Sequence, residues 1–173
     1  MTTKPASSAT TGAASPDRLS LFEEMERQFE SNNQGYFKGL LTHPDSIVRT
    51  RAVCILAEIA GENAVEPIGR VLLHDRNALV RHEAAFSLGQ LGLTSGIGAL
   101  GEAVKHDPSF FVRHEAAVAM GVIGSEDARE ILLGALEKDE SEEVRESAEV
   151  ALANLDYIRE TQSTSRFTRM TGG

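Results

Sequence analysis

The sequence predicts an all-α protein, an α-solenoid of about four helical hairpins preceded by one N-terminal helix. The segments VRHEAAFSLGQLG, beginning at Val80, and VRHEAAVAMGVIG, beginning at Val112, are nearly the same and lie 32 residues apart. A fixed period of this size is typical of repeat proteins, whose repeats bury their apolar faces by stacking on one another. Within each segment the apolar residues recur at i, i+4, i+8 and i+11, which is one stripe of an amphipathic helix.

The same step of 32 residues runs through four copies of the repeat. Five positions keep their character in every copy: Val48, Val80, Val112 and Val144; Arg49, Arg81, Arg113 and Arg145; Ala52, Ala84, Ala116 and Ala148; Leu56, Leu88, Met120 and Leu152; Ile59, Leu91, Ile123 and Leu155. Residues that favour helix starts stand three positions before each valine: Asp45, Asn77, Ser109 and Ser141. We expect a shorter helix before each of these segments, which places the hairpins at about 34–60, 64–92, 96–124 and 128–156.

Three regions flank or extend the repeats. Residues 18–31 should form a separate helix with its apolar residues on one face. Residues 1–16 are rich in Ser, Thr and Ala without periodicity, so we expect a disordered tail, followed by a single repeat domain over 17–157. Residues 158–173 are polar and mildly basic, and we expect a flexible C-terminal tail.

The spacing D-x-x-x-x-V-R-x-x-A-A-x-x-L-G resembles the HEAT-like repeat family over most of the chain. We expect the aspartates at the hairpin turns, Asp75, Asp107 and Asp139, to bond to the arginine column or to turn amides within the stack. Gly96 to Gly101 match the pattern G-x-G-x-x-G, but they fall inside a helical repeat and lack the strand that a dinucleotide-binding loop requires.

Composition excludes several classes of partner. The chain carries 26 acidic and 17 basic residues, a formal net charge of −9, which argues against nucleic acid and allows a basic protein or a small-molecule substrate. No apolar run is long enough to span a bilayer and no secretory signal is recognisable, so we expect no membrane partner. Cys54 is the only cysteine, which indicates a reducing, cytoplasmic location, and we expect its side chain to lie among apolar neighbours.

Each of the two middle repeats carries a His-Glu pair, His82 with Glu83 and His114 with Glu115. At about 100° per residue, each histidine lies on the side of its helix away from the buried stripe. Stacked helices lie about 8–10 Å apart, so two imidazoles at one level can meet at a single metal ion, with the glutamates as further ligands. Histidine and carboxylate without thiolate suit iron, manganese or zinc better than copper(I) or an iron–sulfur cluster, and two histidines with one carboxylate are also the ligand set of non-haem iron oxygenases.

A pocket is expected beside these ligands. One turn past the histidines come Phe86 and Val118, followed by Gly89 and Gly121, which together suggest a small apolar pocket. Exposed apolar residues along this face suggest that something covers it. The alternative interpretation is that histidine and glutamate near a helix start are ordinary solvated residues.

Three segments resemble deoxyhypusine hydroxylase, a HEAT-like di-iron enzyme: RHEAAFSLGQLG at 81–92, DPSFFVRHEAAVAMGVIG at 107–124 and EEVRESAEVALANLDY at 142–157. The last carries Ala148 where the family usually has cysteine. That family has two such halves, with four His-Glu pairs around two irons, and this chain resembles one half over about 34–157. The resemblance implies that the pairs at 82–83 and 114–115 are metal-site positions and that a homodimer with two iron ions restores all four pairs.

Two classes of function follow from these patterns. The first is a non-haem di-iron oxygenase or hydroxylase-like protein that acts as a homodimer; the family reaction is the dioxygen-dependent hydroxylation of a deoxyhypusine side chain on a translation factor. The second is a metal-free HEAT-repeat scaffold that binds a protein partner on its concave face. A third, more distant possibility is a chromophore-handling role, because phycobilin lyases also use such repeats. The sequence assigns no catalytic residue.

Overall fold

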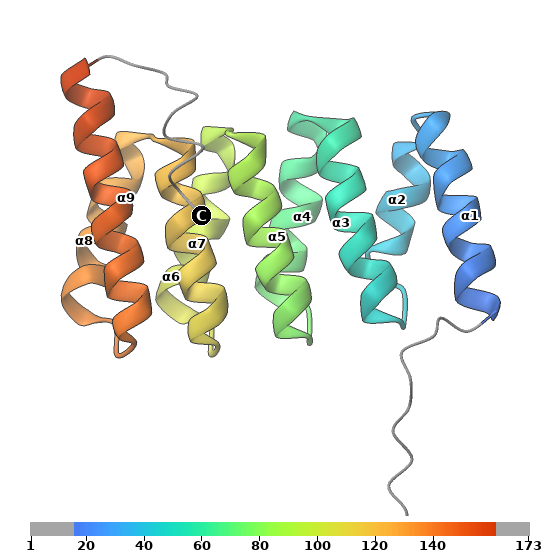
Figure 1. Cartoon of the computed structure of the whole chain (residues 1–173), viewed down its shortest axis with the longest axis horizontal. Helices are drawn as coiled ribbons and strands as arrows, with labels where there is room; N and C mark the ends of the chain where they lie inside the picture. The colour runs from blue at the N-terminus through green and yellow to red at the C-terminus, as the bar shows by residue number, and fades with distance from the viewer. Residues whose placement is uncertain (1–15, 162–173) are drawn as a thin grey trace, which may run out of the picture. The chain divides into compact units, whose positions relative to one another are not determined.

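The computed structural model describes residues 16–161, and its side chains from Arg18 onward. This part of the chain consists of nine α-helices and two short 3₁₀ turns, without strands, so the all-α prediction is confirmed. The helices are α1 (Pro16–Glu30), α2 (Gln34–Leu40), α3 (Ser46–Ala60), α4 (Glu62–His74), α5 (Ala78–Leu91), α6 (Ile97–His106), α7 (Phe110–Ile123), α8 (Arg129–Lys138) and α9 (Glu142–Thr161) (Figure 1). The 3₁₀ turns, Thr94–Gly96 and Glu126–Ala128, precede α6 and α8.

The chain divides after Asn33 into two compact units, the first containing α1 and the second containing α2 to α9. The predicted tails fall almost wholly outside the described residues, except that α1 begins at Pro16 and α9 continues to Thr161. None of the helices between residues 16 and 161 is both long and apolar enough to cross a membrane.

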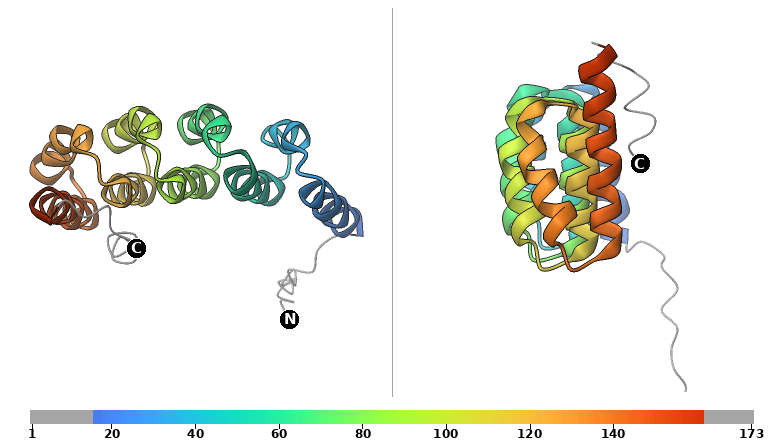
Figure 2. Two further views of the ribbon diagram at one scale, coloured as in Figure 1. Left: turned by 90° about the horizontal axis from the view of Figure 1, so that it is seen from above. Right: turned by 90° about the vertical axis from the view of Figure 1, so that its left-hand side faces the viewer.

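The second unit contains the four predicted hairpins: α2 with α3, α4 with α5, α6 with α7, and α8 with α9. The shorter helices α2, α4, α6 and α8 form one layer and the longer helices α3, α5, α7 and α9 form the other (Figure 2). Within the longer-helix layer, α5 packs against both α3 and α7, and α7 packs against α9. The repeated valine and alanine columns are buried in all four hairpins, so the core runs continuously through the stack, as expected when each repeat supplies its neighbour's missing contacts.

Buried ion pairs connect consecutive hairpins. The bonds join Arg49 to Asp75, Arg81 to Asp107, and Arg113 to Asp139, each through Nε and Nη2 to the two carboxylate oxygens. The Nε–Oδ2 distances are 2.6, 2.7 and 2.8 Å. The predicted bonding between the arginine and aspartate columns is therefore confirmed, and its two-point geometry fixes how each hairpin meets the next.

Polar residues precede the longer helices and glycines follow two of them. Asp45 and Asn77 accept hydrogen bonds from the backbone N–H groups of Ile47 and Leu79, whereas Ser109 makes no such side-chain bond. Both Gly92 and Gly124 follow a longer helix in the left-handed conformation, with φ of 67° and 70°, which glycine adopts at little cost.

Two glycines set the spacing of the longer helices. A Cβ atom added at Gly89 would lie 2.9 Å from the Cα atom of Ala119, and one added at Gly121 would lie 2.8 Å from the Cβ atom of Ala151. No side chain fits at either distance, so α5 and α7, and likewise α7 and α9, approach one another closely only because these residues are glycines.

Alanine substitutions at two helical glycines should therefore have opposite effects. Gly121→Ala pushes against α9 and should lower the free energy of unfolding by about 1–3 kcal/mol. Gly134→Ala in α8 adds a Cβ atom that meets nothing within 4 Å and should raise the free energy of unfolding by about 0.5–1 kcal/mol, because alanine favours the helix more than glycine does. Urea unfolding followed by circular dichroism measures both, and equal effects would contradict the close packing of α7 on α9.

Candidate metal centre

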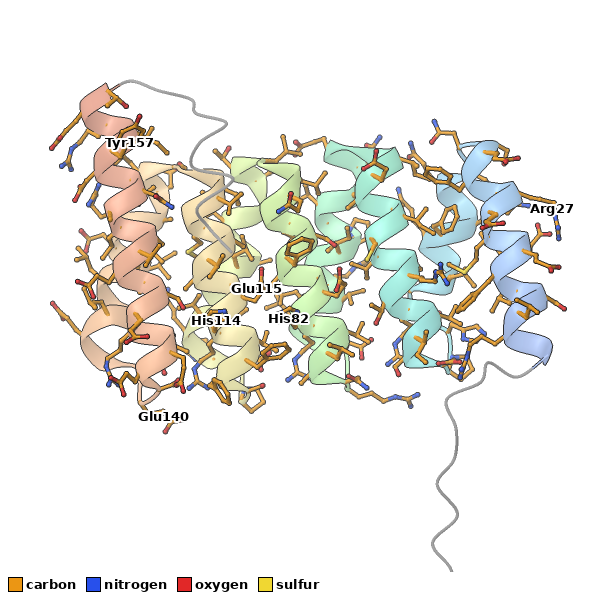
Figure 3. The ribbon with its side chains drawn as sticks, viewed as in Figure 1. Arg27, His82, His114, Glu115, Glu140 and Tyr157 are labelled. Atoms are coloured by element: carbon orange, nitrogen blue, oxygen red, sulfur yellow. The ribbon has the colours of Figure 1, made fainter. Side chains whose placement is uncertain are left out.

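The closest contact among the predicted ligands joins two neighbouring repeats. The Nε2 atom of His82 on α5 lies 3.2 Å from the Oε2 atom of Glu115 on α7. The two side chains are 19% and 11% exposed and point toward one another between the helices (Figure 3). Glu115 stands one repeat plus one residue after His82, so the glutamate of one hairpin meets the histidine of the preceding hairpin.

The imidazole of His82 is also held from one face. The ring of Phe111 stacks on it with centroids 3.9 Å apart and an angle of 6° between the planes. The Nδ1 atom of His82 is buried and has no hydrogen-bond partner among the described residues. Stacking and the contact with Glu115 together fix the ring, and they leave one buried nitrogen unsatisfied.

His114 meets a different partner. Its Nδ1 atom lies 2.6 Å from the hydroxyl oxygen of Ser147 on α9. Ser147 is buried, and its hydroxyl donates a hydrogen bond to the backbone carbonyl of Glu143, also at 2.6 Å. In the fourth repeat Ser147 occupies the position that Glu83 and Glu115 hold in the second and third.

Glu83 is turned toward the first hairpin. The thiol of Cys54 on α3 donates to the Oε1 atom of Glu83, with 3.0 Å between sulfur and oxygen. Cys54 is exposed, so the expectation that it lies among apolar neighbours is wrong; the reason is that its side chain leaves the core stripe to meet this carboxylate. Partial desolvation, with the hydrogen bond to Glu83 and its charge, raises the pKa of the thiol to about 12, so Cys54 is protonated and weakly nucleophilic at neutral pH.

The structure thus brings together two of the four predicted ligands, His82 and Glu115, whereas Glu83 and His114 bond to Cys54 and Ser147. Between residues 16 and 161, no group of three or more His, Cys, Asp or Glu side chains is arranged to hold a metal ion.

Apolar side chains flank these polar contacts on both sides. On the longer helices these apolar side chains stand at positions i and i+7 of one face, and the polar side chains of the site stand between them at i+3 and i+4. The exposed apolar residues at position i are Ile47, Leu79 and Phe111, and those at position i+7 are Phe86 and Val150, with Val118 half-buried between them. We call this surface of α3, α5, α7 and α9, with His82, Glu115 and His114 at its centre, the His-Glu face.

The predicted pocket residues divide between two environments. Phe86 and Val118 lie on the His-Glu face. Gly89 and Gly121 are buried, and each faces an alanine of the next helix. The tight helix contact therefore accounts for both glycines.

Two residues at the site were missed from the sequence, Phe111 and Ser147. Both lie in repeat columns that the sequence displays: Phe111 stands one turn before His114, and Ser147 stands in the glutamate column. The signal that could have revealed them is a pair of offsets from the 32-residue step: Ser147 stands one residue beyond that step from His114, and Phe111 stands three residues short of it from His82.

The donors present fit one half of a metal site. An imidazole nitrogen and a carboxylate oxygen 3.2 Å apart, from two rigid helices, are the types of donor that iron, manganese and zinc accept. The unsatisfied Nδ1 atom of His82 also indicates that its present bonding does not complete the needs of this ring.

Comparison with known proteins agrees with the fold. The family model for HEAT repeats matches residues 34–95 and 65–153. Among solved structures, that of human deoxyhypusine hydroxylase in complex with glycerol matches with a TM-score of 0.70 and 26% sequence identity, covering 86% of this chain and 50% of that chain. The chain thus spans half the length of that protein. A search of curated proteins finds no match.

Proposed function

The chain belongs to the HEAT-repeat family, and from this premise we propose that it is a di-metal, oxygenase- or hydroxylase-like protein whose metal site is completed by a second copy of the chain. The contact between His82 and Glu115 carries the proposal, because it places a nitrogen and an oxygen donor 3.2 Å apart on neighbouring helices. The structural similarity to half of human deoxyhypusine hydroxylase supports it.

Each residue of the site has a proposed part. His82, His114 and Glu115 of the two copies would together hold one metal ion per chain, iron first and manganese or zinc as alternatives, with Glu83 beside them. Iron, when bound, supplies the capacity to activate dioxygen. Phe111 stacks on the His82 ring, and in the proposed dimer the apolar side chains around the site would exclude water. The net charge of −9 suits a basic substrate, such as the side chain of a basic protein.

Two observations support the proposed dimerisation through the His-Glu face. The described residues of one chain supply fewer than three grouped donors, and the match to deoxyhypusine hydroxylase covers half of that protein. A two-fold axis near His82 would bring the same face of a second copy opposite the first and double the number of donors. The exposed apolar side chains on this face would be buried by the same contact.

Metal content and mass in solution test the proposal together. Protein purified without a histidine tag from iron-supplemented cells should contain about one iron atom per chain by elemental analysis and should run as a dimer in light scattering. A metal-free monomer that also takes up no iron, manganese or zinc on reconstitution would overturn the proposal.

A charge placed on the His-Glu face should separate the subunits and release the metal at the same time. Phe86→Asp would bury two unpaired carboxylates in the interface, one from each copy, and should raise the dimer dissociation constant at least about 100-fold. The matched control is Leu73→Asp, which changes a similarly exposed apolar residue on α4 in the other layer. Light scattering and elemental analysis should show loss of dimer and metal in the first variant only; retention of the metal by a monomeric Phe86→Asp variant would contradict a shared site.

The second candidate function is a metal-free scaffold that binds a protein partner on the same face. The observation that favours it is that both histidines already have partners within the chain, Glu115 and Ser147. This alternative predicts no tightly held metal, and it predicts that histidine substitutions change only the affinity for the partner.

A further inference from the structure

We propose that Ser147 is a positioning residue that fixes the tautomer of His114, so that the Nε2 atom of this imidazole is left with a free lone pair for a metal ion. The inference rests on the proposed function, and it extends that function to a residue on a third helix, α9.

The single proton of the hydroxyl decides the direction of these bonds. The Oγ atom of Ser147 lies 2.6 Å from the carbonyl oxygen of Glu143 and 2.6 Å from the Nδ1 atom of His114. A carbonyl oxygen only accepts, so the hydroxyl proton lies toward Glu143. The contact with His114 must then run the other way, with the Nδ1–H group donating to Oγ.

This arrangement sets the chemistry of the other nitrogen. A neutral imidazole carries one proton, and a proton on Nδ1 leaves a lone pair on Nε2. Ser147 is only 7% exposed, so water has little access to compete for the bond. Metal-binding histidines characteristically donate their second ring N–H group to an oxygen acceptor, which fixes both tautomer and orientation.

His82 is prepared differently. Its Nε2 atom faces the Oε2 atom of Glu115, and a carboxylate only accepts, so in the metal-free chain the proton of a neutral His82 lies on Nε2. The Nδ1 atom is then the unprotonated one, buried and without a partner. In this arrangement the lone pair of His114 lies on Nε2, whereas that of His82 lies on its buried Nδ1 atom.

The position of Ser147 in the repeat agrees with this role. Glutamates occupy the same column in the second and third repeats, where Glu115 meets His82 across the gap between helices. Ser147 meets His114 across the next gap, and it offers a short hydroxyl in place of a carboxylate. At α9, therefore, this column carries a hydroxyl group that orients His114 in place of a carboxylate.

Nitrogen NMR of the metal-free protein tests the tautomer directly. Histidine is labelled with ¹⁵N, spectra are recorded in mildly alkaline buffer where imidazoles are neutral, and the signals of His114 are assigned by their absence in His114→Gln. Wild type should show the Nδ1–H form of His114. Ser147→Ala should lose that form, and Ser147→Thr, which keeps the hydroxyl, should retain it.

Metal titration supplies the second readout. With Fe²⁺ under anaerobic conditions, Ser147→Ala should bind about 10–100-fold more weakly than wild type, and Ser147→Thr within a few-fold of it. The control is Thr161→Val, because the Thr161 hydroxyl makes the same 2.6 Å bond to the carbonyl four residues earlier, about four turns further along α9. That variant should leave both readouts unchanged.

The outcomes separate the two proposals. An Nε2–H form of His114 in wild type, or unchanged Fe²⁺ affinity in Ser147→Ala, overturns the role of Ser147 and leaves the metal site standing. Failure of wild type to bind Fe²⁺, Mn²⁺ or Zn²⁺ overturns the proposed function, and with it the role of Ser147 in metal binding.

Discussion

Replacing Asp75 with alanine is expected to lower the free energy of unfolding by about 3–5 kcal/mol, because the change removes one partner of a buried ion pair. Asp75 accepts both bonds of the Arg49 guanidinium, and the two side chains are only 6% and 5% exposed. Without the carboxylate, a full positive charge remains buried between the first two hairpins. Urea unfolding followed by circular dichroism measures the loss.

An exposed ion pair on the surface of α4 provides the control. Arg70 and Glu66 on α4 form a pair in which the side chains are 69% and 71% exposed. Such pairs contribute at most about 0.5 kcal/mol, so Glu66→Ala should hardly change the unfolding midpoint. If both variants lost the same stability, the pairs between hairpins would be no more than surface contacts.

The same contact predicts how stability depends on pH. Burial by itself would raise the pKa of Asp75 and of Asp139, but the bonds from Arg49 or Arg113 and from a backbone N–H group outweigh it, and both pKa values lie below the ordinary value of 3.8. A carboxyl group with a lower pKa in the folded chain stabilises the fold above the unfolded value, and it loses this contribution as the pH falls through the folded value. Wild-type stability should therefore fall below about pH 4, and in Asp75→Ala that fall should be shallower.

His82→Ala and His114→Ala should each weaken metal binding by at least about 100-fold while the protein stays folded. Each change removes a nitrogen ligand of the proposed site, and the glutamates alone do not replace it. His82 is partly exposed and both histidines lie outside the buried core columns, so we expect the free energy of unfolding to fall by less than about 1–2 kcal/mol. Metal titration and thermal unfolding measure the two effects.

His106→Ala is the matched control for these variants. His106 ends α6 on the other layer, its side chain is 72% exposed, and its nearest carboxylate, Glu102, lies at 3.9 Å. Its removal should leave metal binding unchanged. Wild-type metal affinity in both His82→Ala and His114→Ala would exclude the di-metal proposal and favour the scaffold.

The hairpins could be predicted because the repeat itself reports the packing. A residue such as Val80 recurs every 32 positions since it fills the same place in each stacked unit, and Arg81 recurs with it since each turn aspartate needs the same partner. Both residues contact the next repeat, so both recur in the sequence with the same period of 32 residues. The four hairpins and the ion pairs between them follow from this alone.

The candidate site was predicted only in part. The sequence identifies His82 and Glu115 as polar residues on one face, and it groups each with its neighbour in the chain. In the structure the pairing is across helices, His82 with Glu115, His114 with Ser147 and Glu83 with Cys54. Phe111 and Ser147 act through contacts between adjacent helices, Phe111 with His82 and Ser147 with His114. A comparison of one repeat with the next does not reveal such contacts.

By itself, then, the sequence determined the solenoid, the number of hairpins and the face that carries the His-Glu pairs, because the 32-residue period and the helical period are properties of the chain alone. Only the tertiary structure decided which side chains meet. The close approach of Gly89 to Ala119 and of Gly121 to Ala151 sets how α5, α7 and α9 align. In this alignment His82 faces Glu115 and His114 faces Ser147, each one residue beyond a full repeat. A shift of that size decides whether a histidine faces a carboxylate, a hydroxyl or another histidine, and it is fixed by packing between helices, which no local pattern of residues records.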